Sequence, residues 1–383
     1  MFLRKHLPEF GYTVERQERE GILKRKSMST HHKSVPRTIY SVFLSMTLLL
    51  FTYGCSPAYV IQAGLAELKI LTSRRPITEV IRDNATPSDL RTKLTLVSEA
   101  RKFASETLAM DVGTSYTTFT QLDRDTLALV LSASPKDTLE PKTWWFPIVG
   151  RFPYRGFFDE DKALAAQLAL QKEGFDTYLR PTSAFSTLGW FSDPILSTVL
   201  RQNEIGLVET VLHELAHNHL FVRDQVDFNE SFATFVGRAG TIEFFCTHLD
   251  TSAANLLCEQ AKARQTDQKQ FDRFFSGFIK DLQKIYQNNK LSFSEKLAKR
   301  GKIFDQSLDY FVNTIQPNLE ILSYQYFSAT PINNATLLAQ LRYNTRLSEF
   351  NNLIEEWGNL RSAIAYVKNN AESRKDPFSL LEE

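Results

Sequence analysis

The sequence predicts an α+β fold that is mainly α-helical with a small sheet, and three observations carry this prediction. Residues 57–110 place apolar side chains at helical spacing, with Pro76 as an interruption. Residues 115–158 hold short runs typical of strands, separated by glycine and proline. Beyond Pro194 nearly every segment has a helical pattern. With 43% hydrophobic and 23% charged residues, the composition excludes fibrous, disordered and multi-spanning membrane proteins.

The first half of the chain alternates helix and strand signals. Residues 86–89, Thr-Pro-Ser-Asp, offer capping side chains for a helix that runs to about Ala109. Strand-like runs follow at Tyr116–Phe119 and Leu127–Leu131. The aromatic segment 144–158 is punctuated by glycine and proline, which indicates short strands and turns. We expect these strands to form a small sheet flanked by the N-terminal helices.

The chain then returns to helix. Asp159–Glu173 predicts an amphipathic helix that Gly174 closes, and Phe175–Leu179 predicts a short strand. Ser186–Pro194 is expected to be a loop, and helices follow to the end of the chain. No repeat or low-complexity tract breaks the pattern, so we expect one domain. Polar interruptions in the helical half lie near residues 223–228, 249–254 and 315–335.

Residues 1–54 are predicted to be an export signal outside the folded domain. The uncharged run 39–53 falls short of a confident bilayer span, and basic side chains precede it, as in a secretory signal. Met28 would begin a signal of ordinary length, so translation is expected to start there, with a cytoplasmic tail as the alternative. The folded part is then an α+β core at 55–248, with a helical C-terminal part at 249–383 packed on it.

A cysteine follows the apolar run directly. Gly54-Cys55-Ser56 resembles the bacterial lipobox, whose cysteine becomes lipidated and then forms the N-terminus, although Thr52 stands where that motif usually has Leu. The resemblance implies a lipoprotein that is exported and anchored, through a lipid on Cys55, to a bacterial membrane facing the periplasm. Ser56 after the cysteine favours the outer membrane. The alternative is a signal anchor in which Cys55 is an ordinary thiol.

The formal net charge of +1 averages two unlike parts. The whole chain has 45 Lys+Arg and 44 Asp+Glu residues, and nine of the basic and four of the acidic residues lie in the first 54 positions. The remainder therefore has 36 basic and 40 acidic residues, a net charge of −4. Because the basic excess belongs to the export signal, there is no electrostatic case for binding nucleic acid. The sequence leaves the oligomeric state open.

Two cysteines remain beyond the signal, Cys246 and Cys258. In an oxidising periplasm they could form a disulfide across a short loop, which stabilises by roughly 3 kcal/mol on the loop-entropy model. Two buried free thiols on helices are the equal alternative, because the sequence does not set the distance between the two Cα atoms.

Residues 213–217, His-Glu-Leu-Ala-His, match the H-E-x-x-H pattern inside the apolar helix expected at Ile205–Leu220. His213 and His217 are four residues apart, so both imidazoles leave one helical face and can meet one ion. Glu214 points beside that ion, which suits a general base for a zinc-activated water. Such a match arises by chance in about one chain of this composition in a hundred. The alternative is a core helix with two hydrogen-bonded histidines.

A third ligand is needed, because catalytic zinc usually takes three protein ligands and a water. The polar connection 223–228 leads to a helix expected from Asn229 to Phe245, and Asp227 is expected to cap it. A tight helix–turn–helix would return the first turn of this second helix to the first one. Glu230 lies in that turn and completes a predicted site for one Zn²⁺ per chain. The alternative is a solvated glutamate that stabilises the helix dipole.

The segment around Glu230 carries a resemblance. Asn229–Ala233 resembles the Asn-Glu-x-Phe-Ala element that supplies the third ligand in gluzincin aminopeptidases, after a shorter connection than in those enzymes. Over roughly 55–245 the chain resembles the predicted-aminopeptidase family of bacterial lipoproteins, with departures at Trp145, where Cys is usual, and after His217. The residues that carry this resemblance are Gly54–Ser56, Tyr59, Arg74–Ile77, Ser115–Thr117, Trp144–Pro147, Tyr154–Asp159, Ser186–Phe191, Asp193–Pro194, His213–His217 and Phe228–Ala233.

The resemblance implies a zinc metallopeptidase that acts on peptides and trims their N-termini. Among the aromatic segments, Tyr154 and Arg155 are the candidates for lining the substrate cleft or stabilising an oxyanion. An aminopeptidase needs an acidic anchor for the substrate's α-amino group, and Glu209 is one candidate; the favoured alternative for Glu209 is an exposed helix charge. Two other functions stay open: a structural or binding lipoprotein with a structural metal, and an amidase that acts on cell-wall peptides.

Overall fold

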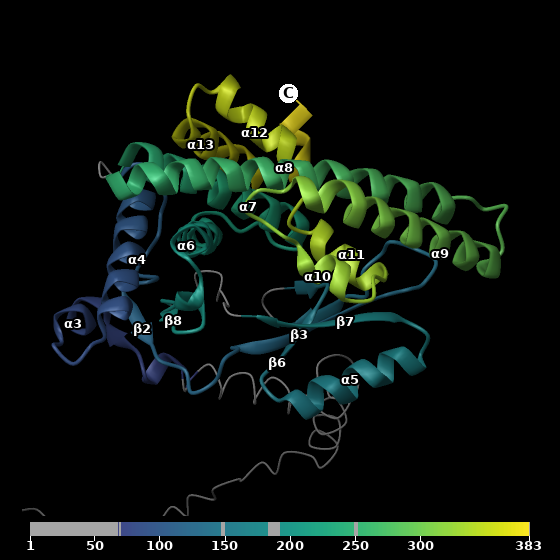
Figure 1. Ribbon diagram of the computed structural model, residues 1–383, viewed down its shortest axis with the longest axis horizontal. Helices are drawn as coiled ribbons and strands as arrows, with labels where there is room; N and C mark the ends of the chain where they lie inside the picture. Colours follow the sequence, from purple (N-terminus) through teal and green to yellow (C-terminus); the bar gives the residue numbers. More distant parts are fainter. Residues whose placement is uncertain (1–67, 69, 147–149, 183–191, 249–251, 383) are drawn as a thin grey trace, which may run out of the picture. The chain divides into compact units, whose positions relative to one another are not determined.

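The computed structural model covers most of the chain beyond the predicted signal (Figure 1). The predicted signal at 1–54 and the predicted lipidation site Cys55 lie outside the described residues, as does most of the loop predicted at Ser186–Pro194. In the part of the chain that is described, no helix is both long and apolar enough to cross a membrane. The described residues are 68, 70–146, 150–182, 192–248 and 252–382.

Helices dominate the structure, and the predicted α+β class is confirmed. The longest helix, α8, runs beside the next one, α9 (Figure 1). The helices are α3 (Ile77–Arg82), α4 (Ser88–Glu106), α5 (Glu160–Lys172), α6 (Glu204–His219), α7 (Val226–Glu243), α8 (Ser252–Tyr286), α9 (Phe293–Tyr310), α10 (Gln325–Ala329), α11 (Asn334–Leu341), α12 (Leu347–Glu356) and α13 (Leu360–Ala371).

The strands divide among small sheets of two or three strands. They are β1 (Arg75–Pro76), β2 (Thr118–Thr120), β3 (Ala128–Ser134), β4 (Trp144–Phe146), β5 (Gly150–Phe152), β6 (Arg155–Phe157), β7 (Asp176–Thr182) and β8 (Ile195–Leu196). One sheet has the order β1-β2-β8 and a second the antiparallel order β6-β3-β7, while β4 and β5 form a hairpin. In the second sheet β3 and β7 pair along their full length, and α5 and α11 cover its opposite faces (Figure 1).

The predicted element boundaries hold to within a few residues where local signals are strong. Asp159 caps α5 by accepting a hydrogen bond from the Lys162 amide at 3.0 Å. Gly174, at φ +91°, ends this segment in the left-handed region that glycine adopts without strain. The helix after Pro87 also begins where predicted, but no side chain caps it. It ends at Glu106.

The C-terminal helices share cores with the rest of the fold. The main core cluster runs from Ile70 to Leu380 in the sequence and is centred on α6 and α7. Helices α12 and α13 pack against α7. A second cluster, built around Phe271, Phe275 and Phe311, joins α8 to the segment after α9. The C-terminal part thus forms walls around α7 and is not a separate appendage.

Candidate metal centre

Helix α6 carries both histidines of the sequence motif. Asn203 caps its first turn by accepting a hydrogen bond from the Gly206 amide at 2.9 Å. The face of the helix that turns to the core is apolar and buried, so packing fixes the rotation of the helix about its axis. His213 and His217 leave the helix one turn apart, and their ring centroids lie 4.9 Å from each other.

A short connection folds α7 back onto α6. The Asn229 side chain clamps it with two hydrogen bonds to the backbone of Val222, donating to the carbonyl at 2.7 Å and accepting from the amide at 2.8 Å. Further along α7, Gly237 lets the helices approach closely. A Cβ atom there would lie 2.9 Å from the Glu209 carbonyl oxygen and 3.3 Å from the His213 Cβ. The Asn229 clamp and the small residue at 237 therefore set where Glu230 meets α6.

Glu230 completes a cluster that could hold a metal ion. Its Oε2 atom lies 3.3 Å from the Nε2 atom of His213 and 3.5 Å from that of His217. All three ligand atoms lie within 4.8 Å of one another. Ligands at about 2.0–2.1 Å from one tetrahedral ion are separated by roughly 3.4 Å, so two of the three spacings match such a site. This cluster is the one of its kind in the described part of the chain.

The cluster is buried and strongly coupled. Burial raises the pKa of Glu230, but its contacts with His213 and His217 outweigh burial and hold that pKa well below its usual value. Burial lowers the pKa of His217, yet Glu230, with a smaller effect of Glu214, leaves it raised. The buried Nδ1 atom of His217 has no hydrogen-bond partner. Glu230 is thus a carboxylate whose Oε2 atom meets two imidazole nitrogens, a donor set that fits a divalent cation.

Glu214 is held beside the cluster without a partner of its own. Its side chain is half-buried, and it makes no hydrogen bond or ion pair with another described residue. The negative charge of Glu214 raises the pKa of His217, Tyr116 and Tyr343, so these three side chains lie within its electrostatic range. A carboxylate without hydrogen-bond partners next to a candidate metal site is suited to taking and giving a proton.

The opposite wall of the site comes from the segment between α11 and α12. The Tyr343 ring centroid lies 6.0 Å from that of His213. The Tyr343 hydroxyl accepts a hydrogen bond from Arg180 at 3.2 Å. Burial raises the pKa of Tyr343, and Glu230 raises it further, so the hydroxyl keeps its proton. Sequence reasoning missed Tyr343, because it lies about 125 residues beyond the motif and belongs to no recognisable pattern.

The two predicted cleft residues, Tyr154 and Arg155, have different surroundings in the structure. Tyr154 lies within electrostatic range of Glu230, which together with burial raises the pKa of the phenol well above its usual value. Arg342, and not Arg155, places its guanidinium over the Tyr154 ring, 4.8 Å from the centroid. The Arg155 guanidinium lies over the Phe157 ring at 5.2 Å.

Other predicted roles also change. Glu209, a candidate anchor for a substrate amine, pairs with Arg264 at 2.7 Å and accepts a hydrogen bond from Gln268 at 3.0 Å. Both partners belong to α8, so the Glu209 carboxylate is already engaged within the fold. Asp227 was expected to cap α7, but that helix begins earlier, with Gln225 at the cap and Asp227 inside the first turn. The correction leaves the Asp227 carboxylate to face the site. Burial and Glu230 raise the pKa of Asp227, and Arg342 partly offsets this.

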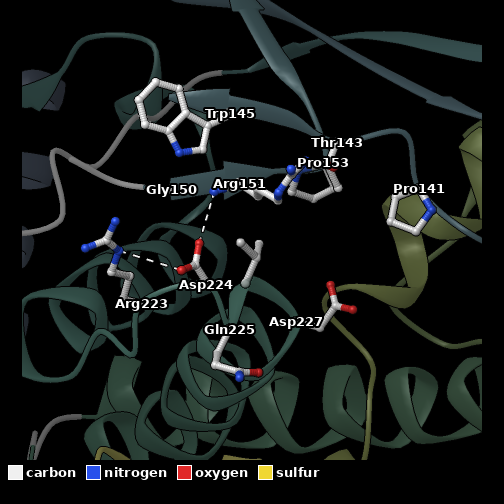
Figure 2. A pocket seen from close by; sticks show the side chains of 11 residues that line it. Pro141, Thr143, Trp145, Gly150, Arg151, Pro153, Arg223, Asp224, Gln225 and Asp227 are labelled. Carbon is white, nitrogen blue, oxygen red and sulfur yellow. Dashed lines mark hydrogen bonds and ion pairs between the residues drawn. The ribbon is translucent and has the colours of Figure 1, made fainter. Parts of the chain in front are cut away.

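A pocket of about 450 Å³ lies near the candidate metal ligands, between the β4–β5 hairpin and the start of α7 (Figure 2). Its lining includes Trp145, Arg151 and Asp227, but none of the cluster residues. Asp227 links the two, because one turn of α7 separates it from Glu230. The hairpin docks closely: Asp224 accepts a hydrogen bond from the Arg151 amide at 3.1 Å.

The two cysteines beyond the signal are joined in the structure. A disulfide links Cys246 to Cys258, with their Cα atoms 4.9 Å apart. It ties the π-helical turn after α7 (Phe244–His248) to the first turns of α8. The bridge braces the far end of the helix that carries Glu230.

Comparison with known proteins gives one match. A family model with the description "Putative aminopeptidase" matches residues 58–376, which include the metal cluster and the Tyr343 wall. No curated protein and no solved structure matches the chain.

Proposed function

The chain belongs to the family described as "Putative aminopeptidase", and from that premise we propose that it is a zinc-dependent aminopeptidase with its metal on His213, His217 and Glu230. The convergence of the two Nε2 atoms on one Glu230 oxygen, at 3.3 and 3.5 Å, carries this proposal. Two imidazoles and a carboxylate are a donor set that catalytic zinc takes in hydrolases, with a fourth position left for water.

The residues around the cluster divide the chemistry of hydrolysis among them. Bound zinc supplies a Lewis acid that acidifies water and polarises a peptide carbonyl. Glu214 takes the proton of the attacking water and delivers it to the leaving amine. The Tyr343 hydroxyl accepts from Arg180, so its own proton is free to be donated toward the charge that develops on the carbonyl oxygen. Tyr154 lines the same wall.

Removal of amino-terminal residues requires an acid that holds the substrate's α-amino group. Asp227 fits this role better than Glu209, because Glu209 is bound by Arg264 and Gln268. Asp227 instead lines the pocket and lies one turn before Glu230. Peptides with free N-termini should therefore be cleaved faster than the same peptides with acetylated N-termini. Equal rates for the two sets would replace the aminopeptidase assignment with endopeptidase or cell-wall amidase action.

The rival function is a binding or structural lipoprotein with a structural metal. A structural zinc site is usually closed by four protein ligands, whereas the described residues bring three together here, with an uncommitted Glu214 beside them. The proposal also includes export and a lipid on Cys55, with the outer membrane favoured by Ser56. Cys55→Ser should release the protein from membranes; retention there would leave a signal anchor.

Metal content and activity together test the proposed function. The purified chain from Ser56 onward should hold about one zinc per molecule, and Glu230→Ala should lose it. Glu214→Gln should keep the zinc and lose activity on a peptide panel by roughly 10²- to 10⁴-fold, the usual contribution of a general acid–base residue. Full activity in Glu214→Gln, or an inactive wild type that holds its zinc, would leave the structural role.

A further inference from the structure

Arg342 is a buried charge without an anionic partner among the described residues. The residue follows α11 directly, and its carbonyl accepts a hydrogen bond from the Ser231 hydroxyl at 3.3 Å. Its exposed fraction is 2%. The Nε and Nη1 atoms are buried with no hydrogen-bond partner, and no ion pair joins the guanidinium to a carboxylate among the described residues.

The Arg342 guanidinium lies within electrostatic range of residues that neighbour the candidate metal ligands. Its Cζ atom lies 4.8 Å from the centroid of the Tyr154 ring. Its positive charge also reaches Tyr343 and Asp227, where it opposes the rise of each pKa. The next residue, one position along, is the tyrosine whose ring lies against His213. Arg342 therefore lies against Tyr154 and next in sequence to the tyrosine that contacts His213.

Two half-buried arginines, Arg300 and Arg180, have polar partners. Arg300 pairs with Asp176 at 2.6 Å and donates to the Lys136 carbonyl at 2.6 Å. Arg180 donates to the Tyr343 hydroxyl. An unpaired buried guanidinium is costly, because it has lost its water without gaining an anion. The cost at Arg342 is removed if an anionic group enters the site with the substrate.

We propose that Arg342 binds a carboxylate of the peptide substrate, so that the enzyme prefers peptides with an acidic group beside the bond it cleaves. This deepens the proposed function and rests on it. A guanidinium recognises carboxylate and phosphate alike. The neighbouring Asp227, Glu214 and Glu230 repel a doubly charged phosphate more than a singly charged carboxylate. Two sources of the carboxylate fit: the side chain of an acidic N-terminal residue, and the α-carboxylate of a dipeptide.

Two pairs of peptides separate these sources. Asp-Ala-Ala-amide and Asn-Ala-Ala-amide differ only in a side-chain carboxylate, whereas Ala-Ala and Ala-Ala-amide differ only in the α-carboxylate. With the zinc-loaded wild type, kcat/KM should favour the acidic member of one pair by about 10- to 100-fold, and that pair identifies the source. In Arg342→Met the preference should disappear while the amide member is still cleaved. The matched control Arg300→Met should keep the preference.

Stability gives a second readout. Arg342→Met removes a buried unpaired charge, so the thermal midpoint without ligand should stay or rise, whereas Arg300→Met strands Asp176 and should lower it. A fall in Arg342→Met as large as in the control would assign Arg342 to the fold and overturn the proposal. The absence of any preference in wild type, or its persistence in Arg342→Met, would overturn it as well.

A binding measurement separates this proposal from the proposed function. Calorimetric titration of zinc-loaded Glu214→Gln with the same four peptides measures affinity without turnover. If wild type cleaves none of the peptides but Glu214→Gln binds the acidic member at least tenfold more tightly, and Arg342→Met removes that difference, the carboxylate site stands and the peptidase function fails. Equal affinities for both members of each pair would reject the carboxylate site alone.

Discussion

The two walls of the metal centre are built in different ways. The α6–α7 wall takes its residues from one continuous stretch, in which the cluster from His213 to Glu230 spans less than twenty positions. The α11–α12 wall places Tyr343 against His213, and Arg342 against Tyr154, from more than a hundred positions further on than the cluster. The first wall holds the proposed metal ligands, and the second carries the residues proposed to handle the substrate. Metal binding and substrate handling should therefore respond separately to substitutions.

The difference also explains what the sequence could predict. Helical periodicity places His213 and His217 on one face, and a short connection returns Glu230 to them, so local spacing predicts the cluster. Asp159 and Gly174 likewise place the ends of α5 from local chemistry. The residues of the α6–α7 wall that form the cluster all lie close together in the sequence.

The second wall could not be predicted in this way. Tyr343 follows an apolar helix like many other residues, and only the packing of α11 on β3 and β7 brings it to His213. Arg155 is predicted from the aromatic segment, whereas in space the guanidinium over the Tyr154 ring is that of Arg342. Distant contacts of this kind depend on tertiary packing, which a single sequence does not encode in any short pattern.

Removal of the Tyr343 hydroxyl should give the largest difference between an effect on activity and an effect on metal binding. Tyr343→Phe deletes the donor proposed for the developing oxyanion, and loss of one such donor lowers kcat by about 10²- to 10³-fold. Zinc content should stay near one per chain, because the metal ligands all lie on the other wall. Steady-state kinetics and elemental analysis of the same preparation measure both quantities.

Tyr326→Phe is the matched control for that variant. Its hydroxyl donates to Gln340 at 2.8 Å on the exposed side of α10, and it contacts no member of the site. Activity should be unchanged in Tyr326→Phe. If Tyr343→Phe loses zinc together with activity, the two walls do not act separately and the tyrosine has a structural role.

The close approach of α6 and α7 should be sensitive to a single methyl group. In Gly237→Ala the new Cβ would lie 2.9 Å from a backbone oxygen of Glu209, so the helices must move apart. Overpacking of this kind costs about 1–3 kcal/mol in unfolding free energy, and the shift should also weaken zinc binding. Chemical denaturation and competition with a chelator measure the two effects.

A second helical glycine provides the control. Gly277 in α8 has no atom within 4 Å of an added Cβ, so Gly277→Ala should stabilise the protein by about 0.5–1 kcal/mol through helix propensity alone. Its zinc affinity should match wild type. A Gly237→Ala protein with normal zinc affinity would show that the approach of the two helices does not set the ligand geometry.

The smallest expected effect is the pH dependence of the metal-free protein. The pKa of His217 is raised in the folded state, mainly because Glu230 outweighs the effect of burial. Its contribution to stability is therefore complete below the unfolded pKa near 6.5 and is lost as pH rises through the folded pKa. Glu230, whose pKa is depressed, loses its contribution only in strong acid. The thermal midpoint of the metal-free wild type should accordingly fall as pH rises above 6.5.

Glu230→Gln isolates this effect, because it removes the charge that raises the pKa of His217. Burial lowers the pKa of His219, which accepts from the Asp111 amide, so His219 contributes the opposite slope in both proteins and cancels from their difference. Zinc should reverse the wild-type slope, since the metal competes with protons for the same nitrogens and binds more tightly at higher pH. Tyr343→Phe should leave both slopes as in wild type, because it leaves the α6–α7 wall intact. Identical midpoints for metal-free wild type and Glu230→Gln from pH 5 to 9 would contradict the coupling between the two ligands on which the whole wall depends.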